Sequence, residues 1–180
     1  MRKVVLYHLQ SLDGVGEEPG DWMSGGGPEI FENLGKIIET QDDVLLGRGT
    51  YDYWVGYWPS SDMEPFASFI NGTQKHVFTS SPLSADWANT TAVDGPAADY
   101  VAELKQGEGG DIGIHGSIEL SRSLLEAGLV DELRLVVAPS LAHKGRKLFA
   151  GDDSGGLRGL ELRESATAEG GALLLWYRFA

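Results

Sequence analysis

Short apolar runs alternate with longer amphipathic segments along the chain. The apolar runs are bounded by glycine, proline, serine or aspartate, which is typical of buried strands. They predict strands at residues 4–9, 44–46, 75–80, 90–93, 112–115, 133–138, 160–165 and 172–179. The segment 28–40 carries its apolar residues on one helical face, and further helices are predicted at 63–70, 97–105 and 118–127.

This order of elements predicts an α/β fold, because short buried strands that alternate with helices form mainly parallel sheets. The Gly170-Gly171 turn between the last two strands predicts an antiparallel C-terminal hairpin. The chain has 180 residues, 42% of them hydrophobic and 23% charged, which is the size and composition of one folded domain. It shows no internal repeat and no interdomain linker, so we expect a single domain over residues 1–180.

The composition excludes several classes of site. The chain has no cysteine, which rules out disulfides, thiolate zinc sites, iron–sulfur clusters and cysteine nucleophiles. The histidines at 8, 76 and 143 have no metal-ligand spacing, and we expect no metal site. The first residues lack a signal-peptide apolar region, and no stretch approaches the length of a membrane span, so we expect a cytoplasmic protein.

The charge of the chain limits its partners. Fourteen Lys and Arg stand against 27 Asp and Glu, which gives a formal net charge of −13. A surface this negative repels phosphate backbones, so we expect neither nucleic acid nor a membrane surface as a partner. An anionic ligand would have to be held by a few local donors.

Three strand ends offer such donors. The first is the turn 47–50 (GRGT), where a following helix start, an arginine and a hydroxyl could receive a phosphate. The second is His115-Gly116-Ser117, and the third is the hydroxyl-rich end 79–81. Each alone is equally consistent with an ordinary capped turn. Three of them on one sheet, however, outline an extended ligand that carries phosphates.

A further candidate is the loop at 13–28, which holds six glycines and two prolines. A loop of this length without secondary structure is more often functional than decorative. An aromatic cluster at 51–58 could stack a planar substrate, form a dimer surface or belong to the core. The sequence leaves these three alternatives open.

At this point the chain resembles a known family. Residues 43–51 (DVLLGRGTY) resemble the pyrophosphate-binding turn of dihydrofolate reductase-like proteins. Residues 11–14 (SLDG) and 110–117 (GDIGIHGS), continuing to about 149, resemble the reductase domain of the bacterial riboflavin-biosynthesis deaminase–reductase. The resemblance covers most of the chain from residue 4 and is typical of a stand-alone member of the group. It implies a dihydrofolate reductase-like α/β/α fold, a homodimer and NADPH as cofactor.

The resemblance also implies positions for the ligands. The implied cofactor-binding residues are Gly47, Arg48, Thr50, Ser80, Ser81, Gly116, Ser117 and Ile118. Among them, Arg48 and Thr50 would hold the phosphates, and Gly116, Ser117 and Ile118 would pack the central pyrophosphate. Ser80 or Ser81 would lie by the adenosine ribose and its 2′-phosphate, with Arg48 near enough to help. Asp13 would lie at the mouth shared by nicotinamide and substrate, with Trp22 in the loop above it.

Two residues depart from the family pattern. The family has a Gly-Gly pair in its second turn, and the sequence suggests that His115 replaces the first glycine. His115 could then face the substrate as a proton donor, or it could be structural. Folate reductases supply the proton from a carboxylate on the first helix. Glu32 falls nearest that position, with Glu29 one turn earlier, although a solvated acid is equally consistent with the sequence.

The predicted function is therefore an NADPH-dependent reductase that transfers a hydride to a small heterocycle. The nearest named activity is that of 5-amino-6-(5-phosphoribosylamino)uracil reductase in riboflavin biosynthesis. Dihydrofolate reductase activity and a nucleotide-binding module without turnover are the alternatives.

Overall fold

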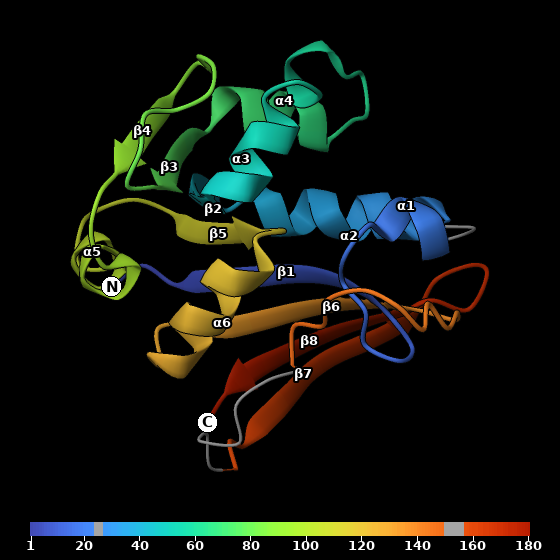
Figure 1. The fold of residues 1–180 in the computed structure, drawn as a ribbon. Helices are drawn as coiled ribbons and strands as arrows, with labels where there is room; N and C mark the ends of the chain where they lie inside the picture. Colours follow the sequence, from blue (N-terminus) through green and yellow to red (C-terminus); the bar gives the residue numbers. More distant parts are fainter. Residues whose placement is uncertain (24–26, 150–156) are drawn as a thin grey trace.

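The computed structural model describes residues 1–23, 27–149 and 157–180, and these ranges contain an eight-stranded sheet with helices on both faces (Figure 1). The strands lie in the order β4-β3-β2-β5-β1-β6-β8-β7. Their bounds are β1 (Val4–Ser11), β2 (Gln41–Gly47), β3 (Gln74–Phe78), β4 (Thr90–Val93), β5 (Asp111–His115), β6 (Glu132–Ala138), β7 (Leu160–Thr167) and β8 (Leu173–Phe179).

The sheet is mostly parallel. All pairs from β4 to β6 are parallel, whereas β6 pairs antiparallel with β8 and β8 antiparallel with β7. Gly170 and Gly171, with φ of 88° and 90°, make the turn of the last hairpin in a conformation that favours glycine. The predicted parallel sheet with an antiparallel C-terminal hairpin is confirmed.

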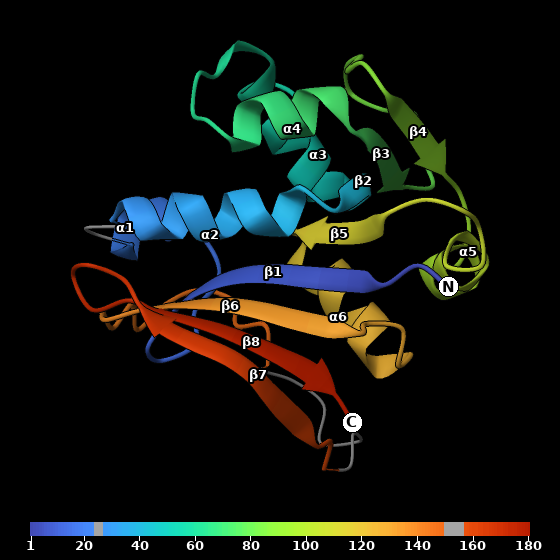
Figure 2. The ribbon, with the colours of Figure 1, turned by 180° about the vertical axis from the view of Figure 1, so that it is seen from behind.

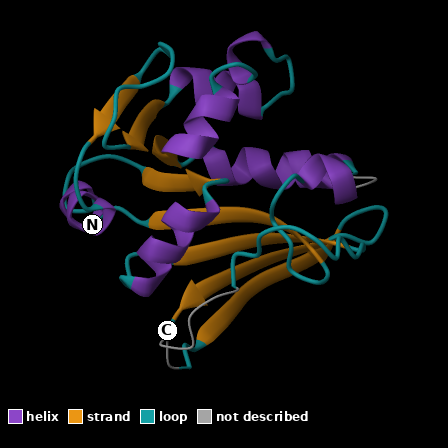
Figure 3. Ribbon diagram, in the orientation of Figure 1, coloured by secondary structure: helices purple, strands orange, loops and turns teal. Residues whose placement is uncertain are grey.

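The helices form two layers. Their bounds are α1 (Pro19–Trp22), α2 (Pro28–Ile38), α3 (Arg48–Trp54), α4 (Phe66–Gly72), α5 (Ala97–Leu104) and α6 (Ile118–Glu126), with a 3-10 turn at η1 (Trp58–Ser60). Helices α2, α3 and α4 cover one face of the sheet, and α5 and α6 cover the other (Figures 2 and 3). This is the predicted three-layer arrangement. Among the described residues, no helix combines the length and hydropathy that crossing a bilayer requires.

The central strands are buried on both sides, which explains their unbroken apolar sequences. In β1, Val5 and Tyr7 pack into the core under α2 and α4, whereas Val4 and Leu6 pack into the core under α5 and α6. Because the central strands are parallel, their carboxyl ends meet at one edge of the sheet. That edge therefore collects the loops that follow β1, β2, β3, β5 and β6.

The structure differs from the sequence prediction in a few places. The third strand ends at Phe78 rather than at residue 80, and α3 already begins at Arg48 within the predicted turn. The glycine-rich loop contains a short helix, α1, which begins at Pro19 and buries Trp22. Burial of this tryptophan is a tertiary contact, so the local sequence did not reveal it. Residues 24–26 of the loop lie outside the described residues.

Candidate functional site at the carboxyl edge of the sheet

The turns after β2 and β5 are joined by one serine side chain. Ser117 Oγ accepts a hydrogen bond from the Gly47 backbone N–H at 2.9 Å and donates to Thr50 Oγ1 at 2.8 Å. The Ser117 backbone N–H also donates to Thr50 Oγ1, at 3.1 Å. Ser117 precedes α6 without making the side-chain cap expected of it, because its hydroxyl is turned towards α3 instead. The two turns therefore form one continuous surface.

The backbone of the second turn corrects one expectation. Gly116 and Ser117 have φ of 65° and 51°, both in the left-handed region that favours glycine. His115 is the last residue of β5, and its φ is not among the positive values. The positions that call for glycine are therefore 116 and 117, so the expectation that His115 replaces a required glycine is wrong. Ile118 is buried as the first residue of α6.

The side chain of His115 is buried in the protein core. Its side chain is 2% exposed, and its ring packs against the rings of Phe66, Phe69 and Tyr7. Its Nε2 is 2.8 Å from Gln41 Oε1. Burial lowers the pKa of His115 to about 3, so the ring is neutral at physiological pH. The proposed role of His115 as a substrate-side proton donor is therefore contradicted by its burial.

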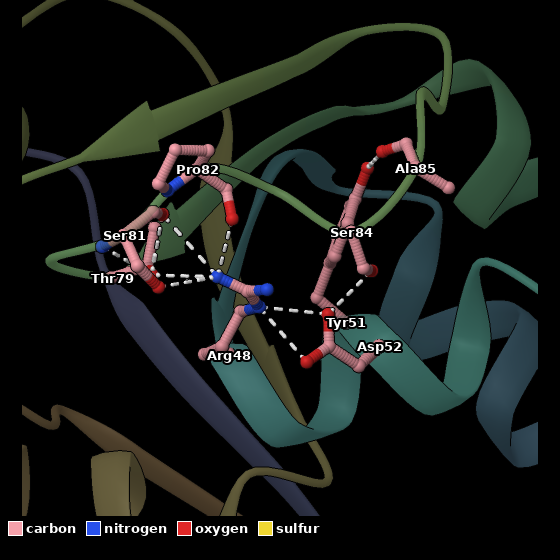
Figure 4. Close-up of polar contacts among 8 residues, drawn as sticks. All are labelled: Arg48, Tyr51, Asp52, Thr79, Ser81, Pro82, Ser84 and Ala85. Carbon is pink, nitrogen blue, oxygen red and sulfur yellow. Dashed lines mark hydrogen bonds and ion pairs between the residues drawn. The ribbon is translucent and has the colours of Figure 1, made fainter.

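Arg48 connects the first turn to the loop after β3 (Figure 4). Its Nη1 donates to Pro82 O at 2.7 Å, to Ser81 Oγ at 2.8 Å, and more weakly to Thr79 Oγ1 and Ser81 O. Its Nε donates to both carboxylate oxygens of Asp52, at 2.7 and 2.9 Å. The three strand ends predicted from the sequence thus lie on one surface.

Two further side chains of α3 hold the same loop. Tyr51 Oη donates to Ala85 O at 2.6 Å, and Ser84 Oγ donates to Asp52 Oδ1 at 2.6 Å. The sequence reasoning missed Asp52, although its spacing four residues after Arg48 is typical of a helical ion pair. Hydrogen bonds from Ser84 and Arg48 lower the pKa of Asp52.

Of the two serines expected beside the adenosine ribose, only one touches Arg48. Ser81 makes the contacts described above, whereas Ser80 is exposed and makes no hydrogen bond among the described residues. Gly49, between Arg48 and Thr50, is exposed, and a Cβ built on it meets no atom within 4 Å. The backbone of the first turn is therefore open to an approaching group.

Asp13 organises the loops after β1 and β6. Its carboxylate accepts hydrogen bonds from Ser11 Oγ at 2.6 Å and from the backbone N–H groups of Ala142 and His143 at 3.0 and 2.9 Å. The bond from Ser11, followed by those from Ala142 and His143, holds the pKa of Asp13 well below its usual range. Asp13 is therefore ionised at physiological pH and holds the loop that follows β6 through Ala142 and His143.

These two loops enclose a groove of about 610 Å³. Trp22 lies in its wall, buried, with Nε1 donating to Glu17 O at 2.7 Å. The groove is lined by Glu17, Glu18, Asp21, Trp22, Ser140, Leu141, Ala142, Lys144 and Gly145. Trp22 thus lies in a wall that carries three acids and one lysine. Its implied position above nicotinamide and substrate stays a prediction.

The two acids of α2 differ in their surroundings. Glu32 is exposed. Glu29 is half-buried, and its Oε2 is shielded from solvent without a hydrogen-bond partner among the described residues. Glu29 Oε2 lies against Gly27, where any side chain would overlap with it. The carboxylate that turns inward is therefore that of Glu29.

The sequence reasoning also missed His8 as a candidate. His8 is 3% exposed, and burial lowers its pKa to about 4. Within the part of the chain that the structure describes, its buried Nε2 has no hydrogen-bond partner. Gly16 lies directly against the ring, so that a side chain at 16 would overlap with it. His8 is therefore a neutral base beneath the loop that follows β1.

Known proteins resemble this chain over most of its length. YwjB of Bacillus subtilis (strain 168), an uncharacterized protein, is 32% identical over 151 residues, which are 82% of this chain and 83% of YwjB. Among solved structures, a protein of Shewanella sp. PV-4 that is provisionally assigned to riboflavin biosynthesis superposes with a TM-score of 0.80 at 18% identity, over 99% of both chains. Dihydrofolate reductase from Enterococcus faecalis, complexed with NADP(H), superposes with a TM-score of 0.65 at 16% identity, over 98% of this chain and 96% of that one.

These superpositions show a dihydrofolate reductase-like fold. The sequence model of the RibD C-terminal domain matches residues 2–174, which is nearly the whole chain. The protein therefore belongs to the RibD C-terminal domain family.

Proposed function

We propose that the protein is a reductase that binds NADPH along the carboxyl edge of the sheet and transfers a hydride to a small heterocyclic substrate. The observation that carries the proposal is the joining of three strand ends through Ser117 and Arg48. An extended dinucleotide needs such a continuous row of donors. Membership of the RibD C-terminal domain family and the NADP(H) complex of a protein with the same fold support this choice.

The residues present fit the cofactor. The open backbone at Gly49 and the exposed Gly116 leave room for a pyrophosphate to approach the starts of α3 and α6. Thr50 Oγ1 accepts two hydrogen bonds, and its own hydroxyl proton has no acceptor among the described residues. We therefore propose that Gly47, Arg48, Thr50, Gly116, Ser117 and Ile118 hold the phosphates, and that Ser80 and Ser81 border the adenosine ribose.

NADPH, when bound, supplies the hydride, and the chain supplies alignment and proton control. Asp13 remains ionised, so its proposed role is to fix the loop at 140–143 beside the mouth rather than to donate a proton. Glu29 is a better candidate proton donor than Glu32, because its Oε2 is shielded and has no partner in residues 1–23, 27–149 and 157–180, whereas Glu32 is exposed.

The charge of the groove bears on the substrate. Glu17, Glu18 and Asp21 face a single lysine, Lys144, across it. A phosphate placed there would meet more negative than positive charge. We therefore propose an unphosphorylated heterocycle, or one whose phosphate lies outside this groove.

Cofactor binding is tested by the fluorescence of NADPH on titration with the protein. We expect binding by the wild type and weaker binding by Arg48→Ala. Lys36→Ala, which removes an exposed cation from α2, is the matched control and should bind as the wild type does. No binding at millimolar NADPH would overturn the proposal.

Turnover is tested by NADPH oxidation with a panel of pterins, pyrimidine precursors of flavins, and ketones. Oxidation that depends on one substrate class supports the reductase. Binding of NADPH without oxidation by any member of the panel would favour the alternative, a nucleotide-binding module.

We also propose that the protein forms a homodimer through β7. All eight residues of this edge strand are exposed, including Leu160 and Leu162, and an edge strand of this kind is a template for pairing with a second copy. Arg163 lies between Glu161 and Glu164, so two antiparallel copies of β7 can pair Arg with Glu in both directions. Light scattering that gives the monomer mass of 19.4 kDa would reject the dimer.

A further inference from the structure

Arg48, which is proposed to hold cofactor phosphates, contacts Ser81, which is proposed to border the adenosine ribose. Arg48 is already paired with a carboxylate of its own helix. Arg48 Nε donates to both oxygens of Asp52, at 2.7 and 2.9 Å. Ser84 Oγ donates to Asp52 Oδ1 at 2.6 Å and fixes the carboxylate from the other side. Figure 4 shows the guanidinium between Asp52 and the loop after β3. The positive charge of Arg48 is thus compensated within the site.

Little of the guanidinium remains for a ligand. Its Nη1 is engaged by the acceptors of the loop at 79–82, and its Nε by Asp52. Only Nη2 has no partner among the described hydrogen bonds. A second acid, Asp86, directly follows Ala85, whose backbone oxygen accepts the hydrogen bond from Tyr51 Oη. Burial raises the pKa of Tyr51, and the charges of Asp86 and Asp52 raise it further. The local charge around Arg48 is therefore negative rather than positive.

We propose that Asp52 is a specificity-determining residue that weakens the preference of the protein for NADPH over NADH. This inference rests on the proposed function. The 2′-phosphate of NADPH carries nearly two negative charges and must either displace Asp52 from Arg48 or bind beside it. The 2′-hydroxyl of NADH carries no charge and meets no such opposition. Asp52 therefore penalises one cofactor and not the other.

Asp52→Asn is the decisive variant. Asparagine keeps the shape and one acceptor oxygen for Ser84 and Arg48, and it removes the charge. We expect its dissociation constant for NADPH to fall about tenfold, and that for NADH to change by less than about twofold. In the Arg48→Ala background the same substitution should improve NADPH binding much less, because no guanidinium is released.

Two controls separate charge from structure. Ser84→Ala removes the hydrogen bond between the loop at 79–85 and Asp52 without changing any charge. We expect it to change the dissociation constants of both dinucleotides by the same factor. Glu39→Gln removes one negative charge at the exposed position that directly follows α2, and it should leave both constants unchanged. The readout for all variants is the ratio of the dissociation constants for NADH and NADPH.

The outcomes are distinguishable. If Asp52→Asn leaves the ratio of the two dissociation constants unchanged or lowers it, Asp52 only positions Arg48 and the loop. That result would overturn the inference about Asp52 and would leave the proposed function standing. If neither the wild type nor Asp52→Asn binds either dinucleotide, the proposed function fails and the inference fails with it. A ratio that rises about tenfold in Asp52→Asn, and not in Glu39→Gln, supports it.

Discussion

His115 couples the stability of the fold to pH. Its ring is buried between the rings of Phe66, Phe69 and Tyr7, and the described structure offers it Gln41 Oε1 as its polar partner. Protonation would place a charge in this apolar surrounding, which is why burial lowers the pKa of His115 to about 3. Acid conditions must therefore favour the unfolded chain, where the same side chain is solvated and can take up a proton.

The sign and size of the effect follow from linkage. The pKa of an unfolded histidine is about 6.5, above the folded value of about 3. The contribution of neutral His115 to the free energy of unfolding is therefore fully present above about pH 6.5, and it is lost progressively as the pH falls towards 3. Between about pH 7.5 and about pH 5, His115 alone should remove about 2 kcal/mol from the free energy of unfolding.

The variant His115→Gln isolates the contribution of His115 to the pH dependence of the free energy of unfolding. Glutamine does not titrate, and its amide can still donate to Gln41. We expect the difference in free energy of unfolding between wild type and variant, measured by urea denaturation, to shift by about 2 kcal/mol in favour of the variant over that pH range. Any packing loss in the variant is a constant offset and does not alter the shift.

The matched control is His143→Asn. His143 is exposed and has a φ of 63°, a conformation that asparagine also tolerates. This variant leaves the buried ring of His115 in place, so we expect it to keep the loss of stability in acid that His115 causes. A stability curve for His115→Gln that is parallel to that of the wild type would refute the reasoning, because it would show that His115 is protonated as easily in the fold as outside it.

Other predictions follow from single contacts. Ser117→Gly should lower the free energy of unfolding by about 1 kcal/mol less than Ser117→Ala does, as measured by urea denaturation. Both variants lose the Oγ hydrogen bonds, but only glycine adopts the left-handed backbone at this position without strain. Equal losses of stability in the two variants would contradict this. Burial lowers the pKa of Lys75 to about 8, below its unfolded value of 10.5, so the free energy of unfolding of the wild type relative to Lys75→Met should rise by about 2 kcal/mol between about pH 8 and about pH 10. A constant difference would argue against a lowered pKa of Lys75 in the folded protein. Asp13→Asn should speed amide hydrogen exchange at Ala142 and His143 about tenfold, because a neutral side chain accepts weaker hydrogen bonds; unchanged exchange would show that other contacts hold the loop.

Much of the fold was predictable because its central strands are buried on both faces. A strand such as β1 must then be apolar at successive positions. This pattern can be recognised in the sequence without knowing which elements pack against the strand. The short helix α1 was not predictable in this way. It is held by burial of Trp22 and by a hydrogen bond from its indole to Glu17 O, both of which depend on how the loop returns to the protein.

The site was predictable as a set of turns but not as a set of contacts. The resemblance located the turn at Arg48 and the turn at Ser117, and the structure brings both to one edge. The position of the left-handed residues in the second turn depends on where β5 ends. The sequence prediction placed the turn one residue too early, and His115 was therefore assigned to the ligand side although it belongs to the core. Similarly, only the packing of α2 decides that Glu29 rather than Glu32 turns inward.

The contacts also explain how an acidic protein could bind a phosphate-bearing ligand at this edge. The hydroxyl of Ser117 and most of the guanidinium of Arg48 are used to join the turns, so they shape the surface more than they present charge to it. Attraction must then come mainly from backbone N–H groups at Gly49 and Gly116 and from the remaining hydroxyl proton of Thr50. Such donors act at short range and do not depend on net charge. If NADPH binds as we propose, its 2′-phosphate lies beside the ion pair of Arg48 and Asp52. Raising the ionic strength should then alter the affinity for NADH little and the affinity for NADPH more.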